Sequence, residues 1–136
     1  RDNQSIGMLI DQDIRPSEAI KVNLLGKAVN STPSVAWLAR RYDGLVVPVF
    51  CFRKPDGQLV MEIFPPLKLV RTGNLKADLG VNTQIINDAV STAVLKEVDQ
   101  WFWFHKRWKR FYPDLYPEEN ERIRRLEAKR AAKEKA

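Results

Sequence analysis

The feature that most constrains the fold of this chain is an apolar run at positions 45–52, Leu-Val-Val-Pro-Val-Phe-Cys-Phe. Because it is rich in β-branched and aromatic residues and has no polar alternation, it predicts a strand buried on both faces. Pro48 cannot donate to a ladder, so one side of the strand is expected to be unpaired or bulged there. The turn signal Pro55-Asp56-Gly57 and a second apolar stretch at 59–64 complete a predicted β-hairpin.

Two helices are predicted on either side of this hairpin in the sequence. Thr32 as an N-cap and Pro33 at the first helical position begin a helix over about 33–42, for which Gly44 is a natural C-cap. A longer helix is predicted over about 81–100, because apolar residues recur there every four positions. The recurring residues are Ile86, Val90, Val94 and Val98.

The N-terminal part is expected to hold a strand and a loop. The apolar run at 6–10, closed by the polar triplet Asp11-Gln12-Asp13, predicts a buried strand with acidic residues at its C-terminal end. In open α/β sheets that end of a strand is where ligands bind. Residues 14–31 show no clear period and predict a loop that covers a site. The order strand, loop, helix, hairpin, long helix therefore indicates an α/β fold, and an incomplete one.

The domain portion is expected to cover residues 1–112. The remainder, 113–136, is highly charged and has few apolar anchors, so it predicts an exposed helical or disordered tail. The chain starts at Arg1 and reaches an apolar run almost at once, which suggests an internal piece of a longer protein. No stretch holds about 18 uninterrupted apolar residues, so none is expected to span a bilayer.

Positive charge is concentrated at the C-terminal end. The formal net charge is +6, and residues 105–136 carry 11 Lys or Arg against 6 Asp or Glu. Such surfaces attract nucleic acid, anionic lipid or acidic proteins. Cys51 is the only cysteine and His105 the only histidine, so neither a disulfide nor a zinc site is expected. Cys51 is predicted to be a small buried apolar residue, and no cofactor is expected.

The pair Asp11 and Asp13 leaves three interpretations open. Two carboxylates at positions i and i+2 can hold a divalent metal together with the phosphate of a nucleotide sugar, as in metal-dependent glycosyltransferases. They can instead orient a catalytic base, or they can accept hydrogen bonds from the backbone amides of a loop.

Residues 101–112 combine aromatic and basic side chains densely. Trp prefers the membrane–water interface, and Lys and Arg beside it reach toward anionic headgroups. In a nucleic-acid-binding module the same residues would stack on bases and contact phosphates. In a third interpretation the rings close a core, and His105 orients or packs rather than acting as a general base. The residues predicted for a membrane interface are Trp101, Trp103, Trp108, Lys106 and Arg110.

Three segments, in matching order and spacing, resemble the lipid A biosynthesis lauroyl/myristoyl acyltransferase family. The first is the apolar run at 6–10 with the Asp-Gln-Asp triplet. The second covers 34–57 and includes Pro48, and the third is the aromatic and basic stretch that begins at Gln100 and ends at Lys109.

The resemblance implies the C-terminal half of a glycerolipid-acyltransferase-like α/β fold at the cytoplasmic face of the cell inner membrane. The implied reaction moves a fatty acyl chain from acyl-acyl carrier protein to a hydroxyl of a lipid A precursor. An anionic membrane surface is an expected partner, and nucleic acid is not. Asp11 and Asp13 would support catalysis. The residues that would contact substrate are Gln12, His105, Arg107 and Lys109.

The family's central motif, His-x-x-x-x-Glu/Asp, supplies the general base for this reaction. No residue of the chain can fill that role, because the single histidine, His105, belongs to the third segment. The chain by itself is therefore expected to be inactive. A basic nucleic-acid-binding module built on 101–112 remains the alternative hypothesis.

Overall fold

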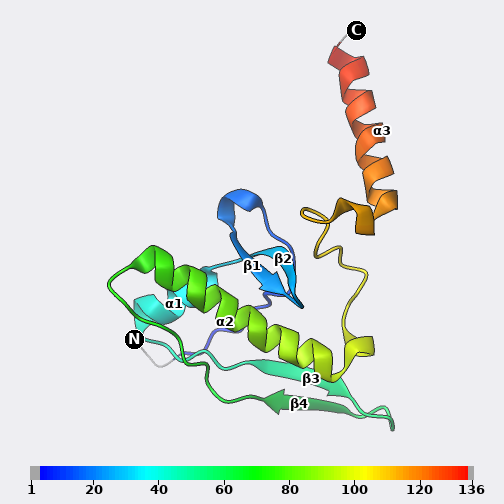
Figure 1. The fold of residues 1–136 in the computed structure, drawn as a ribbon. Helices are drawn as coiled ribbons and strands as arrows, with labels where there is room; N and C mark the ends of the chain where they lie inside the picture. Colours follow the sequence, from blue (N-terminus) through cyan, green and yellow to red (C-terminus); the bar gives the residue numbers. More distant parts are fainter. Residues whose placement is uncertain (1–3, 135–136) are drawn as a thin grey trace.

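The computed structural model describes residues 4–134, and Figure 1 shows how their elements are arranged. The long helix α2 (Leu75–Lys96) runs past two separate two-stranded antiparallel sheets, and α1 (Ser34–Tyr42) packs on it. The α/β class predicted from the sequence is confirmed in this coarse form. The other elements are β1 (Ile20–Leu24), β2 (Lys27–Ser31), β3 (Val49–Arg53), β4 (Leu59–Ile63), α3 (Pro117–Glu134) and the short 3-10 helices η1 (Pro16–Glu18), η2 (Val98–Gln100) and η3 (Pro113–Leu115).

The segment predicted as a loop, 14–31, instead contains the β1–β2 hairpin. Leu25 (φ 51°) and Gly26 (φ 75°) both adopt left-handed backbone angles, which a tight two-residue hairpin turn of the primed type requires. Val22 and Leu24 are buried in the core beside α2. The prediction was wrong because Leu-Gly is a weak turn signal and the alternation of apolar residues in β1 covers only one short strand.

The hairpin predicted around 45–64 is confirmed, with two corrections. β3 begins only after Pro48, although the pairing continues further, where Phe64 N donates to Pro48 O (2.9 Å). Burial on both faces is wrong, because side chains alternate between half-buried and exposed along both strands. Cys51, predicted to be buried, is exposed, because the rest of the chain covers only the face that carries Phe50.

The strand predicted over 6–10 is not formed in the described part of the chain. Residues 4–9 are exposed and have no regular secondary structure, and Ile10 packs against the edge of the core. An apolar run becomes a strand only where a neighbouring strand satisfies its backbone N–H and C=O groups. Neither two-stranded sheet pairs with this run.

Both predicted helices form, but the second begins earlier than its apolar stripe indicated and ends at Lys96, so Val98 of the predicted stripe lies in η2 and is exposed. α1 occupies nearly the predicted range, but its N-cap is Pro33 rather than Thr32, and its left-handed C-cap residue is Asp43 rather than Gly44. At the start of α2 the side chain of Asn74 accepts a hydrogen bond from Ala77 N (3.1 Å) and acts as the N-cap. The first half of the buried face of α2 is polar, so apolar periodicity does not reveal it. Its buried polar residues are Asp78, Asn82, Thr83 and Asn87.

One apolar cluster holds the β1–β2 hairpin against the C-terminal half of α2. The cluster joins the β1–β2 hairpin, α2 and the 101–112 segment, which are far apart in the sequence. The position of the 101–112 segment therefore depends on its contacts with the hairpin and with α2. The buried members of the cluster are Val22, Leu24, Val29, Val90, Val94 and Trp108.

The predicted charged tail forms the helix α3, which projects away from the rest of the molecule (Figure 1). Its first turn is attached by an ion pair between Lys106 Nζ and Glu119 Oε2 (2.9 Å). Ile123 and Leu126 are exposed. Within residues 4–134, no helix combines the length and the apolar character that crossing a bilayer demands.

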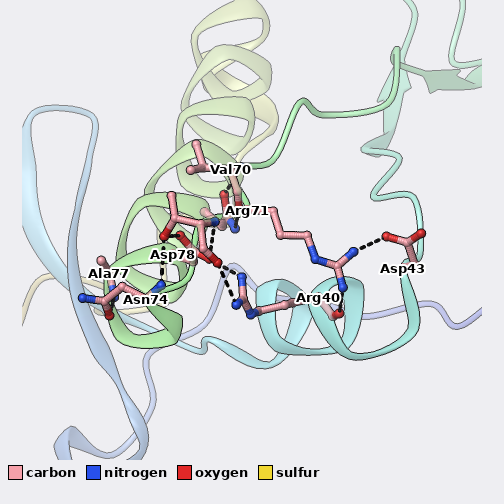
Figure 2. A network of polar contacts seen from close by, with 9 residues as sticks. Arg40, Asp43, Val70, Arg71, Asn74, Ala77 and Asp78 are labelled. Carbon is pink, nitrogen blue, oxygen red and sulfur yellow. Dashed lines mark hydrogen bonds and ion pairs between the residues drawn. The ribbon is translucent and has the colours of Figure 1, made fainter.

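A buried carboxylate fixes the segment that leads into α2 (Figure 2). Asp78 accepts hydrogen bonds from Thr72 N (2.8 Å), from Thr72 Oγ1 (2.7 Å) and from the guanidinium of Arg40 on α1. Arg71 in turn binds Asp43 at the end of α1. Of these bonds, the one from the Thr72 hydroxyl does most to lower the pKa of Asp78, with Arg40 adding to it.

Acid is expected to weaken the fold through Asp78. Its pKa is lower in the folded chain than the unfolded value of about 4, so its bonds stabilise the fold above that pH. This stability is lost as the pH falls through the folded pKa. Asp78→Asn should lower the urea midpoint at pH 7, and the difference from the wild type should shrink as the pH is lowered below about 4. Circular dichroism at several pH values measures both midpoints, and an equal loss at every pH would contradict this role.

Truncation of the core should destabilise the fold where truncation of the surface does not. Leu24 is 1 % exposed and Leu95, on α2, is 67 % exposed. Leu24→Ala removes buried methyl groups and leaves a cavity, so we expect a loss of about 2–5 kcal/mol in the free energy of unfolding. Leu95→Ala should change it by less than about 0.5 kcal/mol. Urea unfolding measures both, and similar losses would place Leu24 outside the core.

Candidate functional site

The acidic triplet and the basic C-terminal segment, far apart in the sequence, meet at Asp13. The backbone N–H of Asp13 donates to Nε2 of His105 over 2.8 Å, and Nε of Arg110 donates to Oδ2 of Asp13 over 2.7 Å. The Asp13 side chain is only 4 % exposed, so a charge-assisted bond holds its carboxylate largely out of water. Asp11, Asp13, His105, Arg107 and Arg110 together form what we call the Asp13 site.

The basic side chains of the Asp13 site come from the 101–112 segment, which does not form an α-helix. Trp103 stacks on the buried Trp108, with ring centroids 6.1 Å apart. The indole N–H of Trp103 also donates to Val98 O (2.7 Å). Both ends of the loop are thereby fixed, and the residues between them, including His105, are directed toward the N-terminal part of the chain.

Arg107 is a fully buried cation that joins β2 to α2. It donates to Asn30 O and, over 2.7 Å, to Oγ of Ser31, both in β2. Ser31 Oγ then donates to Oδ1 of Asn87 on α2 (2.8 Å). Nε of Arg107 has no hydrogen-bond partner among residues 4–134.

Burial and the neighbouring carboxylates act on Arg107 in opposite directions. Burial lowers the pKa of its guanidinium, whereas the charges of Asp13 and Asp11 raise it. An arginine nevertheless stays protonated in proteins, and a buried charge is costly unless it is compensated. Asp13 and Asp11 therefore offset part of this cost through their charge, without a direct ion pair to Arg107 among residues 4–134.

His105 accepts a hydrogen bond, and this limits what its ring can do. Nε2 takes the N–H of Asp13 and is therefore already occupied. Nε2 cannot take a proton from a substrate without releasing Asp13. The geometry therefore gives His105 an orienting role.

One oxygen of Asp13 is left open as an acceptor. Oδ2 is bound by Arg110, whereas the buried Oδ1 has no partner within the part of the chain that the structure describes. With its backbone held by His105 and one oxygen held by Arg110, the carboxylate has a fixed position. It can accept one more hydrogen bond without rearranging.

The other predicted site residues differ in exposure. Gln12 is exposed, and Asp11 and Lys109 are half-buried. Lys109 and Arg110 line a cavity of about 310 Å³ that extends to η3 and the start of α3. Across residues 4–134, no three His, Cys, Asp or Glu side chains are close enough to hold a metal ion together. With Asp13 already bound to Arg110, the metal-dependent interpretation of the triplet has no geometric support.

Of the three tryptophans predicted for a membrane interface, Trp101 and Trp108 contribute to the interior, whereas Trp103 is 44 % exposed. Trp108 is buried, Trp101 packs against the core, and Trp103 lies on Trp108. The most exposed aromatic side chains of the segment are Phe102 and Phe104, at 64 % and 89 %. The sequence did not single them out, because an irregular loop has no period that separates its exposed residues from its buried ones.

The two lysine and arginine side chains predicted for that interface are both paired. Lys106 binds Glu119, and Arg110 binds Asp13. The Lys106 ammonium lowers the pKa of Glu119, mainly through its hydrogen bond. These cations are therefore attached to carboxylates of the same chain.

The side chain of Gln100 satisfies backbone groups at the free edge of β3. Its Oε1 accepts from Arg53 N (2.6 Å) and its Nε2 donates to Arg53 O (2.8 Å). A side-chain amide thus takes the place of a neighbouring strand and connects the hairpin to the start of the 101–112 segment. The sequence points to Gln100 only through the family resemblance, which assigns it no role.

Replacing His105 by alanine is expected to expose the Asp13 amide to exchange. The change removes the acceptor of this partly buried N–H, and loss of such a hydrogen bond costs about 0.5–1.5 kcal/mol. Hydrogen exchange at Asp13, followed by NMR, should therefore become roughly tenfold faster or more. The amide of Val22, in the core, serves as a control and should not change. If Asp13 exchanged at the wild-type rate, the bond to His105 would not hold in solution.

A family model described as bacterial lipid A biosynthesis acyltransferase matches residues 1–110. The matched range contains every residue of the Asp13 site and stops before η3 and α3. No individual curated protein gives a significant match to the chain.

Proposed function

Because the chain belongs to the bacterial lipid A biosynthesis acyltransferase family, we propose that it contributes to transfer of a fatty acyl group from acyl-acyl carrier protein to a hydroxyl of a lipid A precursor. The family supports an acyltransferase role in lipid A biosynthesis. In the proposed reaction the hydroxyl oxygen forms an ester bond with the acyl carbon, and the thioester C–S bond breaks. The proton of the hydroxyl passes through a general base to the departing thiolate.

The observation that carries this proposal is the convergence of two family-matching segments on Asp13. The acidic triplet and the 105–110 stretch have no sequence proximity, yet His105 and Arg110 both bind Asp13 directly. A carboxylate held at both its backbone and its side chain is a suitable supporting group for chemistry, because its position is set before any substrate arrives.

The proposed role of Asp13 is positioning. Its open Oδ1 lies in a nearly dry environment, where a hydrogen bond is stronger than in water. We assign this oxygen to the N–H of the general-base imidazole, whose orientation it would fix. That base is not among residues 1–136, because the single histidine, His105, already holds Asp13.

The proposed location is the cytoplasmic face of the cell inner membrane, beside anionic lipid. An acceptor that is itself a lipid, together with a net charge of +6, supports this location. The alternative, a nucleic-acid-binding module on 101–112, needs exposed rings and free cations. Phe102 and Phe104 are exposed, but Lys106 and Arg110 are both paired with carboxylates of the same chain, so the state of the cations favours the acyltransferase.

A chimera tests this proposal. Residues 6–110 would replace the matching region of an active family enzyme that supplies the His-x-x-x-x-Glu/Asp motif, and acyl transfer would be measured with acyl-acyl carrier protein and a lipid A precursor. The chimera should turn over, and the 136-residue chain alone should not. Asp13→Ala in the chimera should lower kcat by about 10²–10³-fold, the range typical for loss of one preorganised polar contact.

The matched control is Asp99→Ala, which removes an exposed carboxyl group of the same type. It should keep the rate of the parent chimera. Full activity in Asp13→Ala would remove Asp13 from the functional residues. Turnover by the isolated chain at an ordinary enzymatic rate would contradict the assignment of the general base to residues outside it.

A further inference from the structure

The side chain of Lys106 is held by a carboxylate that lies beyond the family-matching region. Lys106 Nζ binds Glu119 Oε2 over 2.9 Å, whereas the family match ends at residue 110. The Glu119 side chain is only 12 % exposed, so water and salt screen this ion pair less than a pair on the open surface. Glu119 therefore connects α3 firmly to the segment that carries the Asp13 site.

Lys106 occupies the centre of a tight three-residue turn. Arg107 N donates to His105 O over 2.7 Å, and a backbone bond across two positions closes a γ-turn. The two flanking side chains bind different parts of the interior, because His105 accepts from Asp13 N and Arg107 donates to β2. The conformation of this turn therefore sets the position of the His105 ring relative to the buried guanidinium of Arg107.

The ion pair with Glu119 holds the central side chain of this turn. Within residues 4–134, Glu119 is the only group that binds the ammonium of Lys106. Without it, the Lys106 side chain would be free to move. Its unpaired ammonium would also directly precede Arg107, a cation whose burial is already costly. Loss of Glu119 is therefore expected to loosen the turn and to add uncompensated positive charge to it.

Further contacts hold the first turn of α3 against the same segment. Trp108 N donates to Tyr116 Oη (3.4 Å), just before α3, and Asn120 Nδ2 donates to Pro113 O (2.9 Å). Glu119 lines the cavity of about 310 Å³ together with Arg110, the residue that binds Oδ2 of Asp13. The position of Glu119 is therefore fixed by more than its own ion pair.

We infer that Glu119 is a positioning residue of the Asp13 site, acting through Lys106 on the turn that directs His105 to the backbone of Asp13. The functional unit then extends past residue 110 into the first turn of α3. If the ion pair served only to attach α3, its loss would leave the site unchanged. The inference rests on the proposed function in one respect, that the Asp13 site supports acyl transfer.

NMR of the 136-residue chain tests this role without any substrate. Glu119→Gln removes the charge and keeps the size of the side chain, so hydrogen exchange at the Asp13 amide should become about twofold to fivefold faster. The Nε2 signal of His105 should move toward that of an imidazole in water, because its hydrogen bond is weakened. Glu118→Gln, at the exposed neighbouring position, should change neither. Circular dichroism checks that both variants remain folded.

A double-mutant cycle tests whether Glu119 acts through Lys106. Lys106→Gln should accelerate exchange at Asp13 by about the same factor as Glu119→Gln. Because both changes remove one interaction, the double variant should exchange no faster than either single variant. The amide of Val22, in the core, should keep its wild-type rate in all three variants.

Acyl transfer by the chimera, extended to carry residues 6–136, measures the consequence for the reaction. Glu119→Gln should lower kcat about twofold to fivefold and leave KM unchanged, because Glu119 supports Asp13 and does not bind substrate in this role. Glu118→Gln should keep both parameters of the parent chimera.

Unchanged Asp13 exchange and His105 signals in Glu119→Gln would overturn the inference, and so would additive effects in the double-mutant cycle. An equal rise in exchange at Val22 would also overturn it, because the ion pair would then contribute only to global stability. Failure of the proposed function is recognised separately, by a parent chimera that shows no acyl transfer. An active chimera in which Glu119→Gln keeps the parent kcat would reject Glu119 as a positioning residue and leave the acyltransferase assignment intact.

Discussion

The burial of Arg107 is the interaction on which most of this structure depends. A guanidinium that is out of water must be matched by acceptors and by negative charge, because its desolvation is otherwise too costly. Asn30 and Ser31 of β2 provide the acceptors, and Asp11 and Asp13 provide the charge. Arg107 thus joins the β1–β2 hairpin to the C-terminal segment, while its neighbours His105 and Arg110 hold the N-terminal triplet through Asp13.

The hydrogen bonds of the candidate site are continuous with those that hold the interior together. His105 and Arg110, neighbours of Arg107 in the sequence, hold the Asp13 backbone and one of its oxygens. Asn87 extends the connection from Ser31 into α2. A site built into the packing in this way is rigid, which favours preorganisation of a supporting carboxylate. It also means that the functional and structural roles of these residues overlap.

The sequence predicted elements wherever a local rule was sufficient. The hairpin turn with Gly57, the N-terminal signals of α1 and the apolar stripe of α2 all act over a few residues, and all gave the correct element. The run at 6–10 failed because a strand needs a partner strand, which no local pattern supplies. The start of α2 was missed because its buried face is polar there, as at Asp78, and is satisfied by distant groups such as Arg40.

The sequence by itself determined the family, the hairpin, the two main helices and the identity of the residues worth examining, including Asp13 and His105. Only the tertiary structure decided what those residues do, because hydrogen bonds across some 90 positions depend on how the elements pack. It placed Arg107 and Trp108 in the interior and left Met61 and its neighbours exposed. Apolar content alone does not specify which face of a strand the rest of the chain can reach.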